Sequence, residues 1–113
     1  MSVEGVWTAE AHGAFGWENR GIFFFENGRT LGGDNRMYCS GTYETSGDKF
    51  EADWLVQYFG PPRTLFGETV ETITLKVTGT LKDDVINAIL RRPDRPGFDL
   101  DYRLTRRGDV PKT

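Results

Sequence analysis

The feature that most constrains the fold of this chain is an alternation of apolar and polar residues with a period of two, which recurs along its length. Such alternation places apolar side chains on one face of a strand and polar side chains on the other. It is clearest at 49–59, where Phe50, Trp54 and Val56 share one face. No segment shows sustained helical periodicity, so the pattern predicts an all-β protein.

Turn residues divide the alternating stretches into short strands. Asn27-Gly28 is the strongest hairpin signal, because both residues tolerate the positive φ of a tight turn. Further connections are predicted at 12–16, 32–35, 46–48 and 60–68. The predicted strands span 3–11, 17–26, 29–31, 36–44, 49–59, 69–81, 85–92 and 98–107.

Residues 85–92 leave two interpretations open. Asp84 could cap a short helix that carries apolar residues on one side and ends before Pro93. Eight residues between two turns fit a strand equally well. Strands precede and follow this segment at regular spacing, and this context favours the strand.

Eight consecutive strands with one apolar face and short connections predict an antiparallel up-and-down barrel, because closure removes the exposed edges. Residues 1–107 form its single domain, and 108–113 are predicted to be a flexible tail. The interior of an eight-stranded barrel is either filled by side chains or holds one small ligand. Aromatic residues make up 13% of the chain, enough to fill much of it.

The charge balance excludes the usual nucleic-acid-binding surface. The formal net charge is −3, whereas a protein that neutralises several phosphates needs a basic face. The longest purely apolar stretch, 22–25, is too short to span a bilayer, and the first residues show no signal peptide. A cytoplasmic protein that binds neither nucleic acid nor membrane is therefore predicted.

The sequence contains no recognisable set of catalytic residues. His12 is the only histidine and lies in a predicted loop, without a recognisable nucleophile or orienting acid. Cys39 is the only cysteine, which excludes an intrachain disulfide and a cysteine-based metal site. Glu51 and Asp53 are spaced as outward strand residues, so they do not indicate a carboxylate pair. We predict a non-enzymatic protein without metal or cofactor.

The motif Gly5-Val6-Trp7 on the first predicted strand resembles the signature of the lipocalins and the wider calycins. The resemblance implies a lipocalin-like barrel in which Trp7 plugs one end. It also implies that an arginine late in the last strand lies over the tryptophan ring in a cation–π contact. Arg106 shares the inward parity of Leu104, so it is the candidate for this arginine.

Several segments together resemble the GrlR-like family. They are 5–8, 26–29, 31–34, Tyr38 with 41–43, 77–80 and 104–107. The resemblance implies a homodimeric barrel that acts as a negative regulator of type III secretion by sequestering a transcriptional activator. In that family an acidic Glu-Asp-Glu-Asp run binds the activator. This chain lacks the run, and its nearest acidic turn makes Asp83 and Asp84 the candidates for binding a protein partner.

Two further sets of residues are candidates for binding. The predicted lining of an interior cavity is Phe23, Phe25, Trp54, Tyr58, Phe98 and Tyr102. Residues 22–25 are consecutively apolar, so rings must point to both faces, and Ile22 and Phe24 are the predicted outward pair. A homodimer would bury this pair, unless the loop residues Leu65 and Phe66 fold over it.

The expected function is a protein-interaction or regulatory module, with a binder of a small apolar ligand as the alternative. The interior of the barrel distinguishes them. An apolar cavity above about 300 Å³, the lower end of ligand pockets, would favour the ligand binder.

Overall fold

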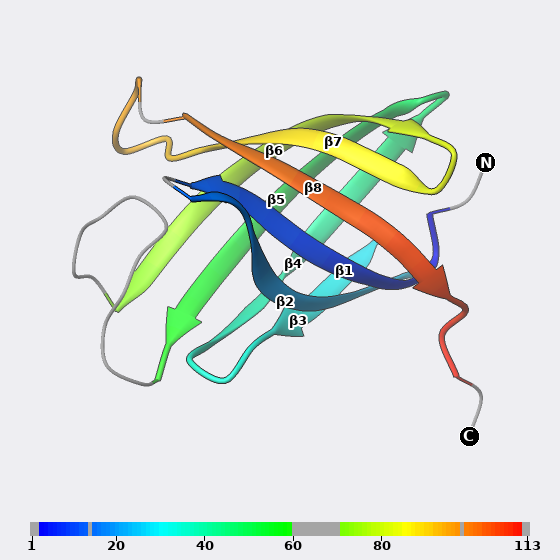
Figure 1. The fold of residues 1–113 in the computed structure, drawn as a ribbon, viewed down its shortest axis with the longest axis horizontal. Helices are drawn as coiled ribbons and strands as arrows, with labels where there is room; N and C mark the ends of the chain where they lie inside the picture. The colour runs from blue at the N-terminus through cyan, green and yellow to red at the C-terminus, as the bar shows by residue number, and fades with distance from the viewer. Residues whose placement is uncertain (1–2, 14, 60–70, 98, 112–113) are drawn as a thin grey trace.

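The computed structural model describes residues 3–13, 15–59, 71–97 and 99–111. It is a closed antiparallel barrel in which each strand pairs with the next along the chain and β1 pairs with β8 (Figure 1). The strands are β1 Gly5–Gly13, β2 Gly16–Glu26, β3 Arg29–Gly33, β4 Met37–Ser46, β5 Lys49–Tyr58, β6 Thr72–Lys82, β7 Val85–Arg91 and β8 Asp99–Gly108. The predicted eight-stranded up-and-down barrel is confirmed.

The ambiguous segment is a strand. β7 pairs with β6 along one edge and with β8 along the other. A helix at this position would have left the facing backbone groups of both neighbours without partners, at the cost of unsatisfied buried hydrogen-bonding groups. The regular spacing of neighbouring strands therefore identified the element correctly.

The predicted inward residues form the core. On β5, Phe50, Ala52, Trp54 and Val56 are all buried, and the residues between them are exposed or half-buried. Aromatic rings fill one half of the interior, where Phe25 lies 5.8 Å from Trp7 and 5.4 Å from Phe50 between ring centroids. On β5, alternation alone thus places the side chains correctly.

The two ends of the barrel differ in their connections. At one end, which we name the closed end, two-residue turns join β2 to β3, β4 to β5 and β6 to β7. Asn27 and Gly28 have φ of 53° and 75°, and Asp83 and Asp84 have φ of 52° and 62°, as type I′ hairpin turns require. The opposite end, which we name the open end, carries the connections 14–15, 34–36, 59–71 and 92–98.

Some predicted boundaries were wrong. β1 continues through His12 to Gly13, where a loop was expected, because His12 pairs with Trp17 in the β1–β2 ladder. β3 continues to Gly33 rather than ending at Leu31, since Gly33 adopts a φ of 151° and still pairs with β4. β8 ends at Gly108, the first residue of the predicted tail.

Some residues to which the sequence analysis gave a role lie outside the described residues. This applies to Phe98 and to the loop residues Leu65 and Phe66. The first residues of the predicted strand 69–81 are also outside, and β6 itself begins at Thr72.

A β-bulge in β2 changes which side chains face the interior. Thr8 pairs with Ile22 and Glu10 pairs with Asn19, so β2 has one extra residue between these pairs. Gly21 lies in this bulge with a φ of 102°. An extra residue exchanges the two faces of the strand beyond it. As a result, Arg20 lines the barrel interior.

Candidate functional site

The open end of the barrel contains a cavity of about 370 Å³. Its volume lies within the range of small-ligand pockets. Its apolar walls come mainly from Phe23, Trp54, Val56, Ile73, Leu75 and Leu90. Its polar groups come mainly from Glu18, Arg20, Asp34, Arg36, Tyr58 and Tyr102. The lining therefore combines apolar side chains with charged and phenolic groups.

The aromatic wall of the cavity is held in place. Phe23 and Trp54 stack with ring centroids 5.0 Å apart and an interplanar angle of 14°. The Trp54 Nε1 donates a hydrogen bond to the Thr30 Oγ1 at 3.2 Å, and Tyr102 meets Trp54 edge-on. Rings fixed by stacking and a hydrogen bond lose little freedom when a ligand binds, so the wall is preorganised.

Most of the predicted cavity residues line this space. Phe23, Trp54 and Tyr102 are buried in its wall, and Tyr58 is half-buried there. Phe25 is buried but is not among the lining residues, since its ring packs towards Trp7 and Phe50 instead.

The charged groups of the cavity differ in how many of their hydrogen-bonding atoms have partners. The Asp34 Oδ1 accepts hydrogen bonds from the backbone N–H groups of Arg36 and Met37, at 2.8 and 3.1 Å. The Arg20 Nη2 donates to the Glu18 Oε2 at 2.9 Å. The Arg20 Nε is buried and has no hydrogen-bond partner, the one such buried side-chain nitrogen or oxygen among the described residues. Asp34 thus serves the β3–β4 connection, and Arg20 retains donor capacity.

Two buried acidic groups of the interior stay protonated at neutral pH. Burial raises the pKa of the Tyr102 phenol well above its ordinary value, and the nearby Arg20 offsets only part of this. Burial also raises the pKa of the Cys39 thiol to about 12. Tyr102 is therefore a neutral hydrogen-bond donor at the cavity, and Cys39 lacks the thiolate that reactivity requires.

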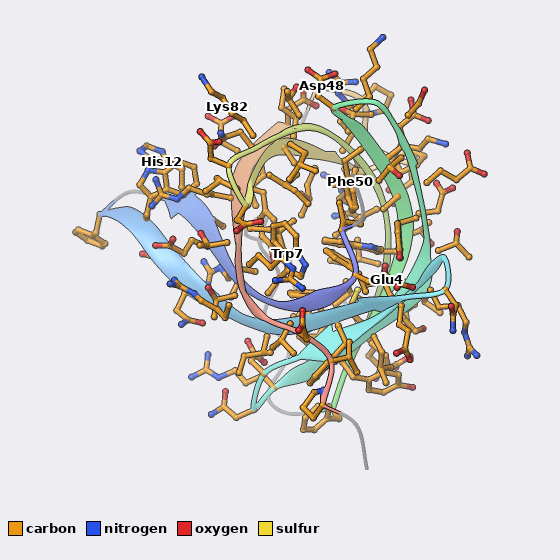
Figure 2. The ribbon with its side chains drawn as sticks, turned by 90° about the vertical axis from the view of Figure 1, so that its right-hand side faces the viewer. Glu4, Trp7, His12, Asp48, Phe50 and Lys82 are labelled. Atoms are coloured by element: carbon orange, nitrogen blue, oxygen red, sulfur yellow. The ribbon has the colours of Figure 1, made fainter. Side chains whose placement is uncertain are left out.

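The closed end is plugged by Trp7, as the calycin resemblance implies. Trp7 is fully buried, and its Nε1 donates to the backbone carbonyl of Val3 at 2.8 Å. Figure 2 views the molecule from the closed end, with Trp7 inside the ring of strands and His12 outside it.

Arg106 does not make the expected cation–π contact. Its Nε and Nη2 donate to the Glu4 carbonyl at 3.1 and 2.9 Å, and Nη2 also pairs with Asp109. Gly5 explains this, because a Cβ there would lie only 2.8 Å from the Arg106 Nε. Without that Cβ, the guanidinium can approach the backbone and bond a carbonyl, which is stronger than ring stacking.

A cation–π contact occurs elsewhere in the described part of the chain. The Arg103 guanidinium lies 4.3 Å from the centroid of the Trp17 ring. His12 meets the same ring edge-on, at 5.3 Å between centroids. Trp17 is 39% exposed, so this cluster belongs to the surface and not to the cavity.

Asp83 and Asp84 form the turn between β6 and β7 at the closed end. Both are exposed, and the Asp84 carbonyl accepts a hydrogen bond from the Arg106 N–H at 2.8 Å. Neither lines the cavity. Their positive φ gives them a structural role, and binding of a partner by their carboxylates stays a prediction.

Ile22 and Phe24 point outward, with 48% and 39% of their surface exposed. Cross-strand pairing extends this surface over β3, β4 and β5, because Phe24 pairs with Leu31, Leu31 with Ser40, and Ser40 with Leu55. We name these exposed residues the outer apolar face: Ile22, Phe24, Leu31, Tyr38 and Leu55.

Comparisons with known proteins leave the family open, since no family model and no curated protein matches the chain. In the described ranges, no helix has the length and apolarity needed to cross a membrane. Those ranges also contain no group of three or more potential metal ligands among His, Cys, Asp and Glu.

The sequence reasoning missed the charged residues of the cavity, and Arg20 and Glu18 are the two that lie on β2. A continuous period of two in β2 would have put Trp17 and Asn19 inside, next to Phe23. The one available signal was Gly21, because a glycine inside a strand often marks a bulge.

Proposed function

We propose that the protein binds a small, largely apolar molecule in the cavity at the open end of the barrel. The observation that carries the proposal is a cavity of about 370 Å³, whose wall includes the buried side chains of Phe23, Trp54 and Leu75 beside charged groups and whose volume lies above the lower end of ligand pockets. A cavity of this size favours the binder of a small ligand, which the sequence offered as the alternative, over the regulatory module. It also agrees with the lipocalin-like arrangement of one plugged and one open end.

Two properties of the cavity support the proposal. Part of its wall is apolar, so a ligand would gain roughly 25 cal/mol for each Å² of apolar surface that it removes from water there. Its rings are also held in place, by the Phe23–Trp54 stack and by the hydrogen bond to Thr30. Little of the binding free energy would therefore be lost in ordering the protein.

The neutral dye N-phenyl-1-naphthylamine tests the proposal, because its fluorescence rises when it enters an apolar site. We expect saturable binding to the wild type. The substitution Val56→Trp, within the cavity wall, should abolish binding by filling the space. Leu55→Trp is the matched control, since Leu55 is the next residue on β5 and is 44% exposed on the outside.

A correctly folded wild type that fails to enhance the dye at micromolar concentration would contradict the ligand-binding function. Equal binding by the wild type and Val56→Trp would place the dye outside the cavity, with the same consequence. Near-ultraviolet circular dichroism establishes that each variant is folded.

The outer apolar face supports a second proposal, that two copies of this chain associate through it. A groove of about 390 Å³ lies on this face, lined in part by Phe24, Leu31 and Val110. Closure of the barrel leaves no strand edge, so association must use side chains. The face also carries Glu26 opposite Arg29, so two copies would meet without net repulsion. A two-fold contact lets one patch cover itself.

Light scattering across a concentration series tests this second proposal. We expect a dimer for the wild type and a monomer for Phe24→Glu, because a charge would be buried in the contact. Asn87→Glu, at an exposed site on β7 whose cross-strand partners lie on β6 and β8, is the matched control and should remain dimeric. A wild type that stays monomeric at high micromolar concentration rules out the dimer.

A further inference from the structure

Arg20 differs from three other paired arginines of this barrel in how it uses its guanidinium, and it differs from Arg91, which pairs with Asp99 through Nε alone, in leaving a buried nitrogen without a partner. Arg92, Arg103 and Arg106 each donate from both Nε and Nη2 to one acceptor group, respectively Asp94, Glu10 and the Glu4 carbonyl. Arg20 donates from Nη2 alone, to Glu18. Its Nε, on the same edge of the guanidinium, has no partner although it is buried.

An incomplete guanidinium edge is unfavourable in the free protein. A buried donor without an acceptor loses its hydration and gains no hydrogen bond in return. Native proteins leave few such groups, so each one calls for an explanation. Since Arg20 lines the cavity, a group of the ligand is the acceptor that would complete the edge.

The other charges of the cavity do not supply that acceptor. The Asp34 Oδ1 is already bound to the backbone of the β3–β4 connection. Glu18 occupies one donor of Arg20, and their side chains are 38% and 32% exposed. An ion pair exposed to this degree contributes little, so an incoming anion can compete with it or join it.

We propose that Arg20 binds the acidic head group of the ligand, and that the ligand is a small molecule with an apolar body and one anionic group. The inference rests on the ligand-binding function proposed above and adds the chemical class. The apolar body contacts the wall formed by Phe23 and Trp54. The head group, a carboxylate or a phosphate, accepts hydrogen bonds from the Nε and Nη2 of Arg20 in the side-by-side geometry that a guanidinium favours.

Tyr102 is placed to assist. Its phenol belongs to the lining of the same cavity, and burial keeps the pKa of that phenol well above neutrality, with Arg20 close enough to affect it. A protonated phenol donates a hydrogen bond and adds no negative charge that would repel an anion.

A series of ligands with one apolar body and different head groups tests the inference by titration calorimetry. The probes are octanoate, octyl phosphate, 1-octanol and octylamine. We expect octanoate or octyl phosphate to bind the wild type at least about 10-fold more tightly than 1-octanol, because a hydrogen bond to a charged group typically has such an effect. The tighter of the two anions identifies the head group, and octylamine should bind no better than 1-octanol.

The substitution Arg20→Gln should remove this preference. We expect the affinity for the preferred anion to fall at least about 10-fold, and the affinity for 1-octanol to change less than about twofold. Arg20→Lys should retain part of the preference, because it keeps the charge and loses the paired donors. Arg91→Gln is the control for net charge, since Arg91 pairs with Asp99 on the outer surface.

The outcomes separate the two proposals. Failure of all four probes to bind would overturn the ligand-binding function itself. Binding of 1-octanol with no preference for either anion would leave that function standing and overturn the assignment of an anionic ligand. A preference that survives in Arg20→Gln and disappears in Arg36→Gln, at the other cavity arginine, would overturn the role of Arg20.

Discussion

The two ends of this barrel are built from the same eight strands, yet aromatic side chains fill one end and the other contains a cavity. At the closed end, the Phe25 ring lies between Trp7 and Phe50, with centroids 5.8 and 5.4 Å away, and these rings fill the interior. At the open end, the inward side chains leave a cavity of about 370 Å³. The difference shows that alternation sets the direction of side chains, whereas their size and the connections decide whether space remains.

Polar groups are treated differently at the two ends as well. At the closed end, the Trp7 Nε1 bonds the Val3 carbonyl, and the Arg106 guanidinium bonds the Glu4 carbonyl through two nitrogens. At the open end, the Arg20 Nε is buried without a partner. Satisfied polar groups stabilise the fold, and an unsatisfied one makes binding of a suitable acceptor favourable. The closed end therefore contributes to stability, and the ligand binding that we propose would take place at the open end.

The largest expected effect is at the plug. Trp7→Ala should lower the free energy of unfolding by about 3–5 kcal/mol, because it leaves a cavity where a fully buried ring stood. Urea denaturation measures this loss. Trp17→Ala is the matched control and should cost about 1 kcal/mol or less, since Trp17 is exposed on the surface. Equal losses for the two variants would refute the description of the closed end as the stabilising one.

Arg106→Ala should cost less than Trp7→Ala, and the two losses should not add. Both side chains hold the segment before β1, through the carbonyls of Val3 and Glu4. Once one contact is lost, the segment before β1 is less ordered and the other contact stabilises it less. The loss in the free energy of unfolding of the double variant should therefore be smaller than the sum of the single losses by at least about 0.5 kcal/mol. Strict additivity would show that the two contacts act independently.

The next effect is a loss of stability at alkaline pH. Burial raises the pKa of Cys39 from 9.0 to about 12, so from pH 9 upward the unfolded chain releases a proton that the folded protein keeps. Stability is therefore full below pH 9 and falls by about 1.4 kcal/mol per pH unit towards pH 12. The raised pKa of Tyr102 acts in the same direction above pH 10. Urea titrations at pH 8 to 11 should show a shallower decline for Cys39→Ala.

A smaller effect is expected from substitution of one glycine at each end. Gly5 and Gly16 have φ of 148° and 95°, so a side chain is strained at both. A Cβ at Gly5 would also lie 2.5 Å from the Gly108 carbonyl oxygen, whereas nothing lies within 4 Å of one at Gly16. Gly5→Ala should therefore cost about 2 kcal/mol more than Gly16→Ala in thermal unfolding. A larger cost at Gly16 would reverse the assignment of the two ends.

The smallest effect concerns the ion pair at the open end. Glu18→Gln removes the competing carboxylate from Arg20, so the anion that Arg20 prefers should bind about threefold more tightly. Its effect on unfolding should stay within about 0.5 kcal/mol, because the pair is partly exposed. Weaker binding of the anion by Glu18→Gln would mean that Glu18 holds Arg20 in position rather than competing for it.

The strands and tight turns could be predicted because they depend on local rules. Asn27-Gly28 adopts the positive φ values that its residue types favour. The inward set of β5 follows from a period of two alone. Even the ambiguous β7 was identified from the spacing of its neighbours.

The cavity and its key polar residue could not be predicted in the same way. A single extra residue at Gly21 exchanges the faces of β2 and brings Arg20 inside, and period two carries no information about where a bulge occurs. The expected Arg106–Trp7 contact was wrong for a related reason. We had predicted it because Arg106 lies on the inward side of its strand, like Leu104. In the structure, the Arg106 guanidinium instead donates to the carbonyl of Glu4.

Closure of the barrel by β1 and β8 fixes where polypeptide attached to either terminus would leave the domain. β1 begins at Gly5, and β8 ends at Gly108, which pairs with Val6, so both exits lie together at the closed end (Figure 1). A fusion partner or a surface tether on either terminus would thus stand behind the plug. Immobilised in this way, the domain would present the end that contains the cavity to the solution.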